Sequence, residues 1–404
     1  MSSAITVFST VAAIIAFGFL ANLLFKRAGF PNSLFLILIG MILGPVLSVF
    51  STADVDPVTP FLTTLTLMMI LFEGGLNMDI FKVISQSFRA AVLAVLYIVS
   101  ATAFVTLFAY LFLGFQWLEA LMLGPMTAGT SSVVIIPLVT KLSISKEVEV
   151  TLSLESTITD VLNIVLVLAV LQTYMGGLVD IPQTLLTILG KFAIGAILLS
   201  VVGIAWIRIL YSARREEYTY MLTLGVLIGA YAVSETLGGS GPLTALLFGL
   251  MLGNDREIFR ALRIKLDLAY LSEVKRFVKQ IQGELAFMIR AFFFVFLGLI
   301  YGIGAGDFII PSILIALIVV SVNLILRHAA VTIATWKSAM FQNRRFMTFM
   351  CGIGLANATL SILLYRELTP SLAIAYLYPA IATNVIVITN IITSIAPFLV
   401  KLRR

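Results

Sequence analysis

About thirteen apolar runs, each near 20 residues long, follow one another along this chain of 404 residues. A helix of about 20 residues rises roughly 30 Å, which matches the hydrocarbon core of a bilayer. The runs cover approximately residues 4–25, 31–50, 58–78, 91–114, 117–139, 150–173, 184–210, 218–237, 242–253, 284–303, 308–333, 346–365 and 371–399. The chain is therefore predicted to be an all-α polytopic membrane protein that interacts with the lipid bilayer.

The distribution of charge supports this class and argues against nucleic-acid binding, although the net charge is +6. Hydrophobic residues make up 60% of the chain and charged residues 11%, whereas a soluble domain has about 45–50% and about 25%. If the N-terminus lies outside, all but four of the 26 Lys and Arg residues fall on the cytoplasmic side. The exceptions are Lys191, Arg290, Arg327 and Arg366. The positive-inside rule thus predicts a cell-membrane protein with its N-terminus outside and its C-terminus in the cytoplasm.

The run from Leu152 to Thr173 carries two carboxylates, Glu155 and Asp160, inside an apolar span. A charged side chain near the centre of a membrane helix costs roughly 2.5–3.5 kcal/mol on insertion scales, so it usually lines an ion or proton pathway. A third acid, Glu73, lies in an otherwise apolar stretch and precedes Gly74 and Gly75, which permit close backbone approach. Glu119, Glu235 and Glu284 fall at span ends, where we expect water to reach them.

Two spans contain residues that interrupt a helix. The segment GPMTAGTSSVVIIPL (124–138) holds prolines, glycines and hydroxyl residues, and CGIGLANATLSILL (351–364) is similar. Interrupted spans at the fifth and twelfth positions fit a repeat over about 1–176, a linker helix over about 184–210, and an inverted repeat over about 218–404. Such transporters hold their ion at the broken helices. The alternative is that small polar residues only let helices pack closely.

Several motifs together resemble those of the monovalent cation/proton antiporters, which exchange sodium or potassium ions for protons. They are LFEGGLNMD (71–79), GPMTAGTSS (124–132), ESTITD (155–160), GSGPLTALLFGLMLGN (239–254), FFFVFLGL (292–299) and Arg327. Their order and spacing are most similar to the NhaP-like, electroneutral branch, over nearly the whole chain. The resemblance implies an NhaA-like fold with two inverted six-helix repeats and crossed broken helices, within one transmembrane domain over 1–404. It also implies a homodimer.

The resemblance implies a role for each of several residues. Asp160 matches the aspartate that takes either a proton or a cation, and Ser156 matches a hydroxyl ligand of the cation. Thr130 matches a residue that offers its backbone carbonyl, and Glu73 matches an acid that reaches the site from the third helix. The predicted monovalent-cation ligands are therefore Asp160, Ser156, Thr130 and Glu73.

Glu155 and Arg327 match a structural ion pair of the same family. Glu155 precedes Asp160 by five residues, about 140° around a helix at 100° per residue, so both cannot point squarely at one ion. This geometry agrees with a structural role for Glu155 and a proton- and cation-binding role for Asp160.

The chain departs from the family pattern at two positions. Thr159 stands where an asparagine usually precedes the aspartate, and it keeps a neutral neighbour beside Asp160. Branches of this fold with two adjacent aspartates move net charge, so Thr159 favours one-for-one, electroneutral exchange. Ser131 stands where an acid usually follows Thr130, which removes a carboxylate from the cation shell and leaves the choice between sodium and potassium open.

The chemistry of the residues agrees with cation/proton exchange for pH and cation homeostasis, without a cofactor. Hard cations take hydroxyl, carbonyl and carboxylate oxygens, and burial favours the protonated acid while a nearby cation favours the carboxylate. An intramembrane aspartyl protease would need two deep aspartates sharing a proton, and Asp160 is the only one, so we expect no enzyme. A sodium-coupled symporter of related fold, or a transporter-like sensor, stays the alternative.

Overall fold

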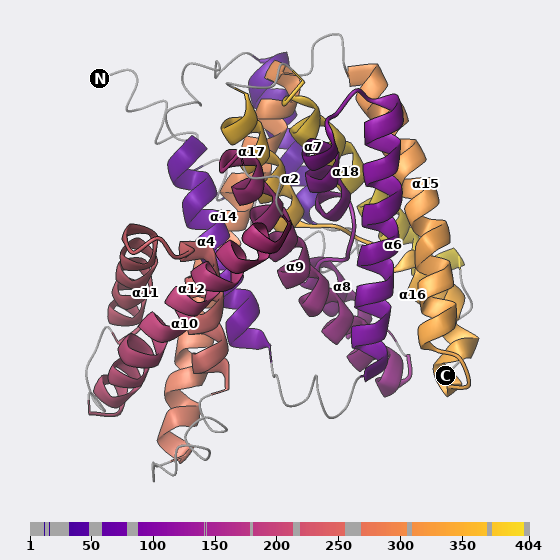
Figure 1. Ribbon diagram of the computed structural model, residues 1–404. Helices are drawn as coiled ribbons and strands as arrows, with labels where there is room; N and C mark the ends of the chain where they lie inside the picture. Colours follow the sequence, from indigo (N-terminus) through magenta and orange to yellow (C-terminus); the bar gives the residue numbers. More distant parts are fainter. Residues whose placement is uncertain are drawn as a thin grey trace. The chain divides into compact units, whose positions relative to one another are not determined.

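The computed structural model describes residues 12, 16, 32–47, 59–78, 88–140, 142, 144–177, 181–212, 219–254, 268–304, 309–369 and 374–399. Every secondary-structure element in this part of the chain is a helix (Figure 1). In chain order the helices are α2 (Asn32–Met41), η1 (Ile42–Val46), α4 (Thr59–Asn77), α6 (Phe88–Phe112), α7 (Trp117–Met126), α8 (Ser132–Val139), α9 (Lys146–Met175), α10 (Ile181–Ser212), α11 (Thr219–Thr236), α12 (Gly241–Gly253), α14 (Leu268–Gly304), α15 (Ile309–Ala334), η3 (Ala339–Asn343), α16 (Arg344–Phe349), α17 (Leu355–Leu368) and α18 (Leu377–Leu399). The predicted all-α class is confirmed.

Six of the described helices are long and apolar enough to cross a bilayer. They are Thr59–Asn77, Phe88–Phe112, Lys146–Met175, Val278–Tyr301, Ile309–Ala334 and Leu377–Phe398. Shorter apolar helices occupy Ser33–Gly44, Ala193–Trp206, Tyr220–Thr236 and Gly241–Gly253. Each of these segments overlaps a predicted span, as expected of a multi-pass membrane protein. The first predicted span, 4–25, lies almost wholly outside the described residues, so the count of thirteen stays a prediction.

The chain divides into two compact units, which we describe separately. Unit 1 comprises Met1–Thr63, Ser87–Gln172 and Met288–Arg404. Unit 2 comprises Thr64–Gln86 and Thr173–Phe287. These boundaries are not those of the predicted repeats, and the repeat organisation stays a prediction.

In unit 1, α6 and α15 lie side by side (Figure 1). Their outward faces carry exposed apolar side chains, including Val99 and Leu107 on α6 and Ile325 on α15, which suits contact with lipid. On the inner side, a buried apolar cluster contains Tyr97 from α6 and Phe346 from α16, together with residues of α8, α9 and α15. This packing holds the short helices α8 and α16 against the long ones.

In unit 2, α4 and α12 cross at glycines. A Cβ added at Gly75 would overlap the carbonyl oxygen of Leu246, and one at Gly249 would overlap that of Phe72. Only glycine permits so close an approach of two backbones. The predicted role of Gly75 in close backbone approach is thus present, beside Glu73 on α4.

One boundary differs from the sequence-based expectation. The tenth predicted span begins near residue 284, but its helix, α14, runs without a break from Leu268 to Gly304. Gly283 lies inside this helix, where glycine costs only about 1 kcal/mol relative to alanine. Gln282, beside that glycine, is buried and accepts a hydrogen bond from Tyr220 Oη at 2.6 Å.

Candidate functional site

The fifth predicted span is interrupted in unit 1. Helix α7 ends at Met126 and α8 begins at Ser132, and we call residues 127–131 the first break. The prolines Pro125 and Pro137 lie inside the two helices. The break instead contains Gly129, whose φ of +84° is a left-handed conformation that favours glycine.

The backbone carbonyls released at the first break are paired by side chains from three other helices. An interrupted membrane helix needs such partners because the bilayer core supplies no water. The hydrogen bonds join Asn357 Nδ2 to Met126 O at 2.7 Å, Asn323 Nδ2 to Thr127 O at 3.0 Å, and Asn163 Nδ2 to Ala128 O at 2.7 Å. Side chains from α17, α15 and α9 therefore stabilise the first break.

A second break lies between α16 and α17 and comprises residues 350–354. The two breaks meet, since the Ser131 backbone N–H donates to Gly352 O at 2.8 Å. A Cβ at Gly354 would overlap Ser131 Oγ, which explains the glycine there. Both sequence-predicted interruptions are present, and they contact each other.

Helix α9 places its polar residues against the first break. Thr159 Oγ1 accepts from the Thr130 N–H at 3.1 Å and donates to Thr130 O at 2.9 Å. Asp160, only 9% exposed, accepts two hydrogen bonds at Oδ2, from Ser132 N at 2.9 Å and Ser132 Oγ at 2.7 Å. The carboxylate thus lies at the N-terminus of α8, where the N–H groups and the helix dipole stabilise negative charge.

The structure brings most of the predicted site residues together in unit 1. Thr130 and Thr159 are in direct contact, and Ser131 is buried at the meeting point of the breaks. Ser156 is buried on α9, one turn before Asp160, and its hydroxyl donates to Ser153 O at 3.0 Å.

Glu73 is the predicted site residue that belongs to unit 2 and not to unit 1. It is half-buried on α4, within unit 2. Its predicted approach to Asp160 stays a prediction.

Glu155 and Arg327 form a bidentate ion pair with no solvent exposure. Arg327 Nη1 lies 2.9 Å from Glu155 Oε1, and Nη2 lies 3.1 Å from Oε2. Planar, two-point contact of this kind is the strongest geometry for an arginine–carboxylate pair. Glu155 is thereby neutralised, whereas Asp160 is held by neutral donors from Ser132.

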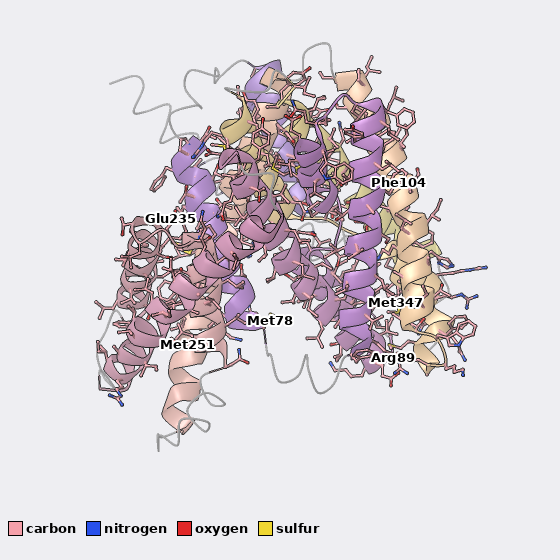
Figure 2. All side chains as sticks on the ribbon, in the orientation of Figure 1. Met78, Arg89, Phe104, Glu235, Met251 and Met347 are labelled. Carbon is pink, nitrogen blue, oxygen red and sulfur yellow. The ribbon has the colours of Figure 1, made fainter. Side chains whose placement is uncertain are left out.

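The ion pair also connects the two breaks. On one side, Thr130 Oγ1 donates to Glu155 Oε1 at 3.0 Å. On the other, Arg327 Nη2 donates to Met350 O at 2.8 Å and Nε donates to Met347 O at 3.2 Å. Met347, labelled in Figure 2, lies on α16 just before the second break. The pair thus fixes the position of one break relative to the other.

Glu119 corrects one expectation from the sequence. It lies at the start of α7 but is only 1% exposed, so water does not bathe it as predicted. Its Oε2 accepts from the Gln116 N–H at 2.8 Å and caps the helix. A capping bond turns the carboxylate back onto the backbone, which explains the burial.

Sequence reasoning missed three residues that build the site: Ser132, Asn163 and Asn323. Asn163 and Asn323 are polar side chains in largely apolar spans, and Ser132 is one of several hydroxyl residues in the first interrupted segment, so the sequence alone does not set these residues apart. Their partners lie 28, 35 and 196 residues away in the chain, so periodicity could not reveal the contacts.

Gly129 yields a stability prediction. A Cβ there would overlap Asn163 Nδ2, which donates to Ala128 O, while φ would remain unfavourable for alanine. We expect Gly129→Ala to lower stability by about 2–4 kcal/mol, measured by thermal unfolding in detergent. Gly114→Ala is the matched control, because Gly114 has a φ of +75° with nothing near its Cβ position. Equal melting temperatures for the two variants would contradict the role assigned to Asn163.

Sequence comparison identifies the family of this fold. Residues 12–401 match the profile of the sodium/hydrogen exchanger transmembrane family. The chain belongs to the sodium/hydrogen exchanger family. This family consists of transporters rather than enzymes in the usual sense.

Individual exchangers are similar to this family member over different lengths. The K+/H+ antiporter NhaP of Alkalimonas amylolytica is 27% identical over 267 residues, which is 64% of this chain and 46% of that protein. A probable Na+/H+ antiporter 2 of Methanocaldococcus jannaschii is 26% identical over 362 residues, covering 85% of this chain and 81% of that protein. The chain therefore spans less than half the length of the first relative and most of the second.

A solved exchanger structure shares the fold. The sodium proton antiporter MjNhaP1 from Methanocaldococcus jannaschii, determined at pH 8, superposes with a TM-score of 0.78 over 98% of this chain and 100% of that one. The sequence identity is 21%. The exchanger fold is thus established independently of close sequence similarity.

Proposed function

We propose that this protein exchanges a monovalent cation, Na+ or K+, for a proton across the cell membrane. The observation that carries the proposal is Asp160, a nearly buried carboxylate held by Ser132 at the break between α7 and α8. Family membership and relatives named as Na+/H+ and K+/H+ antiporters support the same activity.

The proposed mechanism is competition at one group. Asp160 binds a proton when neutral and a cation when charged, so each face of the membrane can load one and release the other. Burial favours the neutral acid, and the Ser132 donors and a bound cation favour the carboxylate. Because Asp160 cannot bind a proton and a cation at the same time, this one group couples the proton flux to the cation flux.

The proposed cation shell consists of oxygen atoms near Asp160. Thr130 O already accepts from Thr159 Oγ1, but a carbonyl has a second lone pair for a cation. Ser156 would turn its hydroxyl oxygen to the ion, and Glu73 would approach from α4. Thr159 and Ser131 would shape the shell as neutral groups, and no resident cofactor is involved.

We further propose electroneutral, one-for-one exchange. In unit 1, Glu155 is neutralised by Arg327 and Thr159 keeps a neutral side chain beside Asp160, so we assign the exchange of one proton for one cation to Asp160. Thr159→Asp places a second carboxylate against the Thr130 backbone and should make exchange depend on membrane voltage. Exchange by this variant that stays insensitive to a clamped voltage would contradict the proposed stoichiometry.

The proposed architecture has thirteen spans in two inverted repeats, with the breaks at equivalent positions in each. The contact between the breaks supports a crossed, NhaA-like arrangement of the interrupted helices. Basic residues support an N-terminus outside and a C-terminus in the cytoplasm. We also propose a homodimer, as the family resemblance implies.

The experiment that tests the activity uses proteoliposomes with an internal pH dye and a clamped voltage. Addition of Na+, K+ or Li+ should trigger proton flux, and the ion with the largest response names the substrate. Protein-free liposomes provide the background. No response to any cation would contradict exchange and favour the symporter or sensor alternative.

A further inference from the structure

Basic and aromatic side chains gather in unit 1 at the end of α15, a helix long and apolar enough to cross the bilayer. We infer that this cluster binds the headgroup of an anionic phospholipid. We call it the basic patch, and its members are Arg89, Trp336, Lys337, Phe341, Arg344 and Arg345. The inference needs only a membrane-spanning α15 and is independent of the proposed exchange.

The exposed face of α15 leads to the basic patch. Leu314, Ile318 and Ile325 are exposed and lie within about 40° of one another around the helix, at 100° per residue. An exposed apolar face on a membrane span suits contact with acyl chains. Trp336, 61% exposed, follows two residues after the helix ends, and tryptophan is enriched where acyl chains meet the headgroups. The patch is therefore placed at the depth of the lipid phosphates.

The basic patch carries four positive charges, one from a lysine and three from arginines. Three of these side chains are exposed and that of Arg344 is half-buried. Within the described part of the chain, none of the four forms an ion pair with a carboxylate. Basic residues next to a membrane span attract anionic lipid headgroups. An anionic phospholipid thus supplies the charge that the patch lacks.

Arg89 joins the patch from another helix. It lies at the start of α6 and is labelled at the lower end of that helix in Figure 2. Leu93, one turn later, packs in the buried cluster that also contains Ala334 and Phe346. The start of α6 and the end of α15 therefore lie at the same end of unit 1.

Aromatic rings hold Arg344 in place. Its Cζ lies 4.3 Å from the centroid of the Phe341 ring, and its Nη1 donates to Phe341 O at 3.2 Å. Trp336 packs edge-on against the same ring, with the centroids 5.9 Å apart. A guanidinium carries five N–H donors in a planar fork that fits phosphate oxygens. One donor fixes Arg344 to the backbone, and others are left for a phosphate.

Lys337 has an unusual backbone conformation. Its φ is +58°, and among the described residues it is the only one other than glycine with a positive φ. This left-handed conformation suits glycine and is uncommon for lysine. Strain of this kind often marks a functional position. Here it places a lysine directly after the exposed Trp336.

A bound headgroup would also stabilise the second break. Helix α16 begins at Arg344, inside the basic patch. Arg327 donates to Met347 O on this helix and to Met350 O just after it. Fixing the start of α16 helps to hold these carbonyls against Arg327. The bound lipid should therefore raise the melting temperature of the protein.

Thermal unfolding of the full chain in neutral detergent, titrated with phosphatidylglycerol, tests the inference. We expect phosphatidylglycerol to raise the melting temperature and phosphatidylcholine, whose headgroup has no net charge, to have little effect. Removing one cation should raise the half-saturating lipid concentration about fivefold, and removing two should raise it roughly 25-fold. Arg345→Gln and Lys337→Gly are the single variants, and their combination is the double variant.

The variants separate lipid binding from folding. Glycine suits the φ of residue 337, so Lys337→Gly should melt close to wild type in detergent alone. Arg208→Gln is the matched control, because it removes one exposed arginine on α10 of unit 2. It should leave the half-saturating concentration unchanged. Equal weakening in Arg208→Gln, equal stabilisation by phosphatidylcholine, or the same stabilisation by inorganic phosphate without lipid would each overturn the inference.

Discussion

Asp160→Asn is expected to abolish cation-triggered proton flux while the protein remains folded. Asparagine has nearly the same shape and keeps a carbonyl oxygen that can accept from Ser132, so the packing around the first break survives. It can neither take up a proton nor carry the charge that binds a cation. Cation-triggered proton flux should therefore be absent at every pH, and a flux that only shifts its pH profile would not agree with this prediction.

The variant is compared with wild type in proteoliposomes, with melting temperature as the check on folding. Glu149→Gln is the matched control, because Glu149 is an acid on the same helix that pairs with Lys146 at 2.6 Å near the surface. The control should transport like wild type. Exchange that persists in Asp160→Asn would show that another group carries the proton.

Arg327→Ala and Glu155→Ala are expected to lower the free energy of unfolding by about 3–5 kcal/mol each, because either change strands a buried charge. Removing Arg327 is expected to destabilise the protein at more contacts than removing Glu155. Arg327 also donates to Met347 O and Met350 O, so its removal leaves carbonyls at the second break unpaired. Thermal unfolding in detergent measures the effect.

An exposed ion pair provides the control for this experiment. Lys146 is 77% exposed in its pair with Glu149, and Lys146→Ala should cost at most about 1 kcal/mol. The double variant Glu155→Ala with Arg327→Ala should cost less than the sum of the single changes, since neither charge is then stranded. Wild-type melting with lost transport in the single variants would place the pair in the ion pathway instead.

The interruptions of two spans and their approximate segments could be predicted from composition, but the residues at which the helices end could not. The prolines of the first interrupted segment, Pro125 and Pro137, both lie inside helices and not in the break. The chain leaves the helix around Gly129, where a left-handed φ is stabilised by Asn163 on another helix. Tertiary hydrogen bonds, and not the local helix propensity of the residues, therefore decide where the helix is interrupted.

The candidate site shows a similar division. Asp160 can be recognised in the sequence as an acid in an apolar span, because placing a charged side chain there is energetically costly and usually serves a function. Nothing local distinguishes Ser132 from its neighbour Ser131, although the first donates to Asp160 and the second to Gly352. Which hydroxyl or N–H faces which partner depends on the rotation of each helix, and that is decided by packing.

Proton release on cation binding tests the central claim most directly. Calorimetric titration of the solubilised protein with NaCl or KCl, in buffers of different ionisation enthalpy, counts protons released per cation bound. We predict about one proton released per cation bound for wild type at a pH low enough for Asp160 to be protonated before the cation binds, and none for Asp160→Asn. Cation binding to wild type with the same heat in every buffer would show that proton and cation do not share a site, and would contradict exchange by competition at Asp160.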